Sequence, residues 1–90
     1  PIDPITNIVN GLEITDYYEC KGEYVAKRID VKSEGYLNIP EFYFLLCAKG
    51  EGGKINGEDI KFGETVFVPA NYGEIKIEGD MRLYFISYKE

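Results

Sequence analysis

The stretch Gly63-Glu64-Thr65-Val66-Phe67-Val68-Pro69, followed by Gly73, decides how this chain is expected to fold. It places a short run of β-branched and aromatic residues between glycines and a proline, which is typical of a β-strand with a turn at each end. Glycines recur along the rest of the chain and leave runs of about 4 to 8 residues, the usual length of a strand. No window sustains the apolar spacing of a helix, so the pattern predicts an all-β fold.

Two hairpin turns are predicted within this pattern. Asn56-Gly57 accepts the positive φ that a two-residue type I′ turn requires, and Gly79-Asp80 suits a type II′ turn. Further strands are expected near Tyr17–Cys20, Tyr24–Val31, Glu41–Lys49 and Thr65–Pro69. About eight short antiparallel strands with tight connections predict a small jelly roll, also called a double-stranded β-helix.

The glycine-rich stretch Gly50-Glu51-Gly52-Gly53-Lys54 is interpreted as another tight turn between strands. A phosphate-binding loop needs a longer spacing, a following Ser or Thr and a helix, whereas Ile55 follows here. The acidic residues near the turns lack the spacing of a calcium-binding loop and are interpreted as solvated edges. They are Glu58, Asp59, Glu74, Glu78 and Asp80.

Composition limits the classes of partner. The 90 residues are expected to form one domain over 1–90, with 44% apolar residues and a net charge of −6. That charge argues against nucleic acid and against an anionic membrane surface, and no apolar run approaches the ~18 residues of a membrane span. Cys20 and Cys47 indicate reduced thiols in a cytoplasmic protein. Because the chain starts at Pro1, we expect it to be a piece of a longer protein.

Two strands are apolar on both faces, which a sheet with one solvated face does not need. Phe42, Phe44, Leu46 and Ala48 alternate with Tyr43, Leu45 and Cys47, and Leu83 and Phe85 alternate with Tyr84, Ile86 and Tyr88. The second face is expected to contact another domain or a second copy in a homodimer. Alternatively, residues 1–14, a linker or covering segment, cover it from within the chain. The candidate interface residues are Tyr43, Leu45, Tyr84 and Tyr88.

Among the carboxylates, Glu41 is the candidate for a place at a cavity. It follows Pro40 at the start of the most apolar strand, where it is expected to line the mouth of a cavity near Tyr43. A plain surface glutamate is the alternative. Cys47, inside the same strand, is expected to be an inert buried thiol. No catalytic, cofactor-binding or metal-binding residue is predicted in this chain.

The order of these pieces resembles one family. The strand from Phe42 ends in a Gly-Glu-Gly turn, the segment 60–70 ends in Pro-Ala, and the segment 75–79 ends in an Ile-x-Gly turn. Over residues 12–88 this order resembles the C-terminal jelly-roll, or cupin, domain of type I mannose-6-phosphate isomerases, particularly the short bacterial form. The resemblance implies a parent enzyme that uses zinc to interconvert mannose 6-phosphate and fructose 6-phosphate, with an upstream catalytic cupin domain as partner.

In that family the zinc ligands (histidines, a glutamate and a glutamine) lie in the upstream domain, and no position of this sequence matches them. A catalytic cupin would also carry a metal-binding histidine shortly after the 63–69 segment, and this sequence contains no histidine. The resemblance therefore implies a non-catalytic domain that is inactive by itself. Two alternatives stay open: a stand-alone small cupin that binds a sugar or another small ligand, and a dimerisation barrel.

Overall fold

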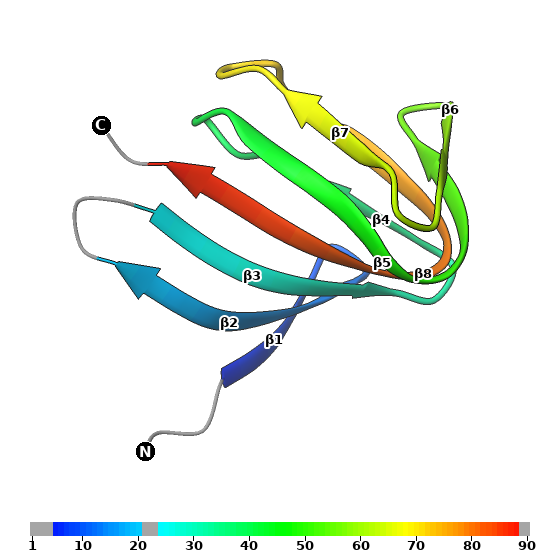
Figure 1. Ribbon diagram of the computed structural model, residues 1–90, viewed down its shortest axis with the longest axis horizontal. Helices are drawn as coiled ribbons and strands as arrows, with labels where there is room; N and C mark the ends of the chain where they lie inside the picture. The colour runs from blue at the N-terminus through cyan, green and yellow to red at the C-terminus, as the bar shows by residue number, and fades with distance from the viewer. Residues whose placement is uncertain (1–4, 21–23, 89–90) are drawn as a thin grey trace.

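The computed structural model describes residues 5–20 and 24–88, and over these residues the chain is all-β, as the sequence predicts (Figure 1). The strands in this part of the chain are β1 (Ile5–Val9), β2 (Leu12–Cys20), β3 (Tyr24–Val31), β4 (Glu34–Leu37), β5 (Tyr43–Ile55), β6 (Glu58–Lys61), β7 (Thr65–Val68) and β8 (Ile75–Tyr88). Their pairings are antiparallel. Within the same residues there is no helix with the length and apolar character needed to cross a membrane.

The strands form one sheet in the order β1-β2-β3-β8-β5-β6, with β4 beside β8 and β7 beside β5. Strands β5 and β8 are 13 and 14 residues long, and each changes neighbours along its length. The first part of β8, residues 75–78, lies between β4 and the end of β5, whereas residues 81–88 lie between β3 and the start of β5. Figure 1 shows the result, a sheet that curls where β5 and β8 bend together.

Gly79-Asp80 is not a hairpin turn. Strand β8 runs without interruption from Ile75 to Tyr88, so the prediction of a type II′ turn is wrong. Gly79 has a φ of +122°, and a Cβ there would lie 2.9 Å from the Cα of Gly53 on β5. The position requires glycine because two backbones cross almost in contact, which is a common reason for glycine inside a strand.

The glycine-rich stretch 50–53 is likewise part of a strand, because it lies inside β5, and its interpretation as a turn is wrong. The register between β5 and β8 shifts between Gly50 and Gly53, and Gly50 and Gly52 have φ values of +99° and +114°. Such irregularities bend a strand and increase its twist. The two glycine groups that the sequence presents as separate turns therefore form a single corner of the curled sheet.

The Asn56-Gly57 turn is confirmed. Its residues have φ values of +51° and +87°, and the flanking Ile55 and Glu58 pair across β5 and β6. This is the geometry of a type I′ hairpin, which matches the right-handed twist of the strands that it joins.

The same dipeptide, Asn10-Gly11, joins β1 to β2, with φ values of +49° and +86°. The described part of residues 1–14 is thus strand and turn, with β1 paired to β2, and does not have the irregular structure expected of a linker. Leu12 is 0% exposed and belongs to the core, because the hairpin lets β2 pair with β3 and turn this side chain inward.

The core lies inside the curl. Every strand from β2 to β8 contributes at least one buried apolar side chain to it. These side chains are Leu12, Ile29, Val31, Leu37, Tyr43, Leu45, Cys47, Ile55, Ile60, Val68, Ile75, Ile77, Met81, Leu83 and Phe85. Strands β5 and β8 supply most of them, so the two strands that bend are also the two that fill the interior.

Candidate functional site

The side of the sheet opposite the core carries a cluster of large apolar side chains. Strand pairing places Phe44 between Phe67 on β7 and Ile86 on β8. Phe42, just before β5, and Tyr88, at the end of β8, extend the cluster in one direction. We call the following six residues the aromatic face: Phe42, Phe44, Leu46, Phe67, Ile86 and Tyr88.

Four rings of the aromatic face contact one another. The Phe44 and Phe67 ring centroids are 5.1 Å apart, Phe42 lies 6.0 Å from Phe67, and Phe42 stacks on Tyr88 at 6.2 Å with an angle of 23° between the rings. Even so, Phe67 is 52% exposed and Tyr88 is 50% exposed. Contiguous apolar surface of this kind on a soluble domain commonly marks an interaction site.

The predicted interface residues divide between the two sides of the sheet. Tyr43 and Leu45 are 0% exposed core residues, so their prediction as interface residues is wrong. Tyr84 and Tyr88 lie on the outward side of β8, where Tyr84 is half-buried and Tyr88 is exposed. Because β5 is apolar on both sides, alternation alone does not tell which side faces inward.

Glu41 and Tyr88, both named from the sequence, line the same hollow at one end of the aromatic face. The hollow has a volume of about 250 Å³ and is lined by Pro40, Glu41, Phe42, Ala70 and Tyr88. The backbone N–H of Asn71 donates to the Pro40 carbonyl at 2.8 Å and so joins the two loops that form its walls. Glu41 therefore lies beside Tyr88 rather than at a cavity mouth with Tyr43.

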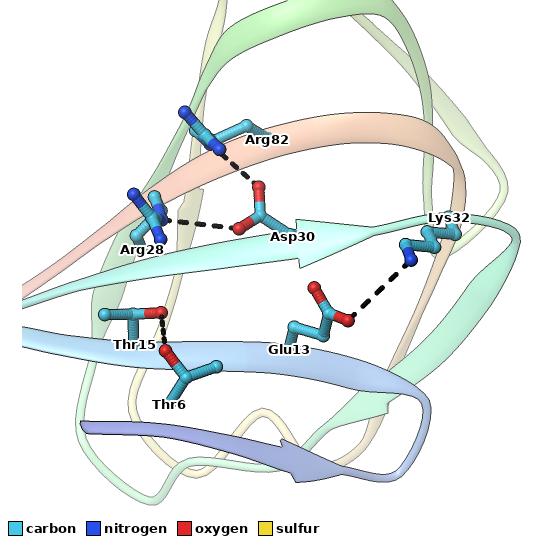
Figure 2. Close-up of polar contacts among 7 residues, drawn as sticks. All are labelled: Thr6, Glu13, Thr15, Arg28, Asp30, Lys32 and Arg82. Carbon is cyan, nitrogen blue, oxygen red and sulfur yellow. Dashed lines mark hydrogen bonds and ion pairs between the residues drawn. The ribbon is translucent and has the colours of Figure 1, made fainter. Parts of the chain in front are cut away.

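The other end of the outward side is charged (Figure 2). The Arg82 Nε donates to Asp30 Oδ1 at 2.8 Å, and the Arg28 Nε lies 3.3 Å from Asp30 Oδ2. All three side chains are partly buried, with exposed fractions between 22% and 29%. Beside them is an open hollow of about 430 Å³, lined in part by Lys32, Lys49 and Asp80.

The interior of the fold offers little reactive chemistry. Cys47 is fully buried, burial raises the pKa of its thiol, and the Sγ contacts the Lys49 carbonyl at 3.9 Å. The neutral thiol is therefore favoured over the nucleophilic thiolate, which confirms the prediction of an inert buried cysteine.

The hydroxyl of Tyr43 is buried beside the Phe85 ring and has no hydrogen-bond partner among the residues that the structure describes. Burial raises the pKa of Tyr43 to about 12, from an ordinary value of 10. A buried hydroxyl without a partner has lost its hydrogen bonds to water and forms none within the protein, which destabilises the folded state.

We therefore expect Tyr43→Phe to leave the free energy of unfolding unchanged at pH 7 or to increase it by ~1 kcal/mol. The unfolded chain loses the Tyr43 proton near pH 10, while the folded chain holds it to about pH 12. The free energy of unfolding of the native sequence should thus fall by about 2 to 3 kcal/mol between pH 10 and pH 12, and the variant should not show this decrease. Urea unfolding of both proteins from pH 7 to 12 measures the difference. A loss of more than ~1 kcal/mol at pH 7 in the variant would show that the hydroxyl has a partner.

A zinc site of the kind found in the resembling family does not fit these residues. The sequence has no histidine, and residues 5–20 and 24–88 contain no group of three or more His, Cys, Asp or Glu side chains arranged to hold a metal ion. Two distant cysteines and solvated carboxylates do not form the four-ligand set that zinc prefers.

A further hollow opens beside β7. It has a volume of about 230 Å³ and an apolar floor that includes Val66, Val68 and Ile75. Its rim includes Asn56 and Tyr72, and the Asn56 Nδ2 donates to the Tyr72 Oη at 3.3 Å. An apolar floor with a few polar rim groups is the usual character of a small-ligand site.

Neither a protein-family model nor a curated protein matches the sequence. Solved structures are similar to it. Pac13 of Streptomyces, a nucleoside dehydratase, is 20% identical, with a TM-score of 0.72 over 94% of this chain and 75% of that chain. The polyketide cyclase RemF of Streptomyces resistomycificus is 16% identical, with a TM-score of 0.75 over 98% and 75%. The mannose 6-phosphate isomerase of Bacillus subtilis is 20% identical, with a TM-score of 0.79 over 96% of this chain and 28% of that chain.

The fold is that of a cupin. The predicted jelly-roll class is thereby confirmed. The three named proteins are a dehydratase, a cyclase and an isomerase, and at 20% identity or less the likeness concerns the fold alone. This chain corresponds to little more than a quarter of the isomerase and to three quarters of the other two proteins.

Proposed function

We propose that this chain is the non-catalytic cupin domain of a cytoplasmic mannose-6-phosphate isomerase. Its aromatic face packs on the catalytic cupin domain of the same polypeptide. The order of sequence motifs over residues 12–88 supports this family, as does the likeness to the Bacillus subtilis isomerase. The catalytic zinc site and the reacting groups belong to the other domain, which agrees with the lack of histidine here.

The observation that carries the proposal is the aromatic face. Burying apolar surface contributes roughly 25 cal/mol per Å², and Phe67 and Tyr88 each retain about half of their surface for a partner to cover. The side chains project from three hydrogen-bonded strands, β7, β5 and β8, so the platform is already ordered. Docking therefore costs little additional conformational entropy on this side of the interface.

One observation favours a second function, the binding of a small ligand by a stand-alone cupin. The hollow beside β7, with Val66 and Val68 in its floor and Tyr72 on its rim, has the character of such a site. Its volume of about 230 Å³ lies below the ~300 Å³ at which pockets for drug-sized ligands begin, so a ligand there would be small or only partly enclosed.

The native gene product tests the proposal. We expect a polypeptide roughly three and a half times as long as this chain, with mannose-6-phosphate isomerase activity, since 96% of this chain matches 28% of the related isomerase. In that full-length protein, Phe44→Asp should make the junction between the domains sensitive to limited proteolysis. Phe62→Asp is the matched control, because Phe62 is 66% exposed and lies outside the aromatic face.

A native product of this length alone, or a longer one without isomerase activity, would contradict the proposal. Saturable binding of a sugar in the hollow beside β7 would then favour the stand-alone cupin. A dimer that Phe44→Asp dissociates would favour the dimerisation barrel.

The 90-residue chain by itself is expected to bind no stoichiometric zinc and to turn over no mannose 6-phosphate. Without histidine it offers no ligand set that would hold a metal and polarise a sugar carbonyl. Elemental analysis after chelator treatment and zinc reloading, together with a coupled isomerase assay, checks both expectations. One zinc per chain or measurable turnover would refute them.

A further inference from the structure

The hollow that contains Glu41 has the size of a single side chain. Its volume of about 250 Å³ is below the range of pockets for drug-sized ligands. The nearly parallel rings of Phe42 and Tyr88, 6.2 Å apart, contribute to its wall, and Pro40 and Ala70 complete an otherwise apolar lining. It lies at the edge of the aromatic face, with which it shares both rings.

Among the residues that the structure describes, Glu41 is the only charged residue that lines this hollow. Within residues 5–20 and 24–88 its carboxylate makes neither an ion pair nor a hydrogen bond, whereas Glu13, Asp30 and Glu34 are each paired with a lysine or an arginine. A free carboxylate beside aromatic rings attracts a cation in two ways, by charge and by the electron-rich ring faces.

We propose that this hollow, the Glu41 socket, receives an arginine side chain from the surface that docks on the aromatic face. The inference rests on the proposed function in taking that surface to be the catalytic domain. A guanidinium group suits the socket better than an ammonium group, because it is planar, stacks on aromatic rings and donates paired hydrogen bonds to a carboxylate. The net charge of −6 on this chain also favours a basic partner surface.

The Glu41 socket lies at one end of the docking surface and so constrains how a partner is oriented on it. One end of the outward side presents Glu41, and the other end presents two arginines, Arg28 and Arg82, that share Asp30. The arginine end carries both signs of charge, because Glu13, Asp30 and Asp80 line the hollow there together with Arg82. A partner with a single basic group opposite Glu41 is therefore held in one register. Charge of this kind contributes specificity and register more than affinity.

A small probe tests the socket on the chain alone. In a titration with N-acetylarginine amide at low salt, followed by NMR of the isotopically labelled chain, we expect saturable shifts of the amides of Glu41, Phe42, Ala70 and Tyr88. Glu41→Gln should weaken the binding by about tenfold, the scale of one charge-assisted hydrogen bond. Tyr88→Leu should weaken it by about threefold, through loss of the stacked ring.

Glu51→Gln is the matched control, because it removes the same charge from an exposed glutamate that lines none of the three hollows. It should leave the binding unchanged. N-acetyllysine amide should bind more weakly than the arginine probe, and N-acetylnorleucine amide should not bind. Equal binding by the native chain and by Glu41→Gln, or shifts that are spread over the whole surface, would overturn the proposal.

The full-length protein separates this inference from the proposed function. Glu41→Arg should loosen the contact between the domains, as Phe44→Asp does. If Phe44→Asp loosens the contact and Glu41→Arg does not, the proposed function stands and the socket is refuted. If the probe binds to the socket but neither substitution affects the full-length protein, the guanidinium site stands and its assignment to the catalytic domain is refuted.

Discussion

Gly53→Ala is expected to destabilise the domain by about 3 kcal/mol or more, a large part of the stability of so small a fold. A Cβ at Gly53 would overlap the backbone carbonyl of Glu78 on the crossing strand β8. Backbone atoms at a strand crossing cannot move aside as the end of a flexible side chain can. Relief would require β5 and β8 to separate, and the core that both strands fill would open.

Urea unfolding followed by circular dichroism measures this effect, and Gly57→Ala provides the comparison. Gly57 has a positive φ, +87°, which Gly53 does not, and no atom lies within 4 Å of a Cβ placed at Gly57. Only backbone strain is expected at that site, on the order of 1 kcal/mol. If the two substitutions cost the same, the strands do not cross as closely as the structure indicates.

Leu45→Lys and Phe44→Lys are expected to have opposite consequences although the residues are neighbours on β5. Leu45 is 0% exposed, so a lysine there would bury a charge without a partner and leave the leucine volume unfilled. We expect a loss of about 4 kcal/mol or more, enough to unfold the chain. Phe44 is only half-buried on the aromatic face, so Phe44→Lys should retain the fold of this domain and loosen its contact with the catalytic domain in the full-length protein.

Thermal unfolding of the chain and limited proteolysis of the full-length protein distinguish the two outcomes. Tyr43→Lys should behave as Leu45→Lys does, because Tyr43 is also 0% exposed. A folded Leu45→Lys variant together with an unfolded Phe44→Lys variant would mean that the two sides of β5 are assigned the wrong way round.

Local sequence was a reliable guide where one short segment determines the geometry. The Asn56-Gly57 hairpin follows from the tolerance of these two residues for positive φ, which is a property of the dipeptide itself. The Asn10-Gly11 hairpin carries the same dipeptide signal, which the prediction of a linker over residues 1–14 does not use. The strand β3 and the burial of Cys47 also follow from the immediate neighbours of these residues in sequence.

The candidate site was only partly predictable. The two doubly apolar strands predict a second apolar face, and Tyr88 lies on the outward side of β8, as the alternation predicts. The contribution of Phe67 has no such signal in the sequence. Phe67 joins the aromatic face through the pairing of β7 with β5, which no local pattern contains. Glu41 was recognised as a candidate, yet its neighbours in the hollow, Ala70 and Tyr88, come from segments 29 and 47 residues further along the chain.

The all-β class, the strand-length spacing of the glycines and the lack of a histidine-based metal site follow from the amino-acid sequence, because each is a property of composition or of a few consecutive residues. The packing of distant strands places Gly50–Gly53 and Gly79 at one corner and turns Phe44 rather than Leu45 outward. An apolar residue is equally suited to either side of a strand, and a glycine to a turn or a crossing. Which side a residue faces, and whether a glycine lies in a turn or at a crossing, depends on the strands that pair beside it. Those strands are far away in sequence, so no local pattern predicts the outcome.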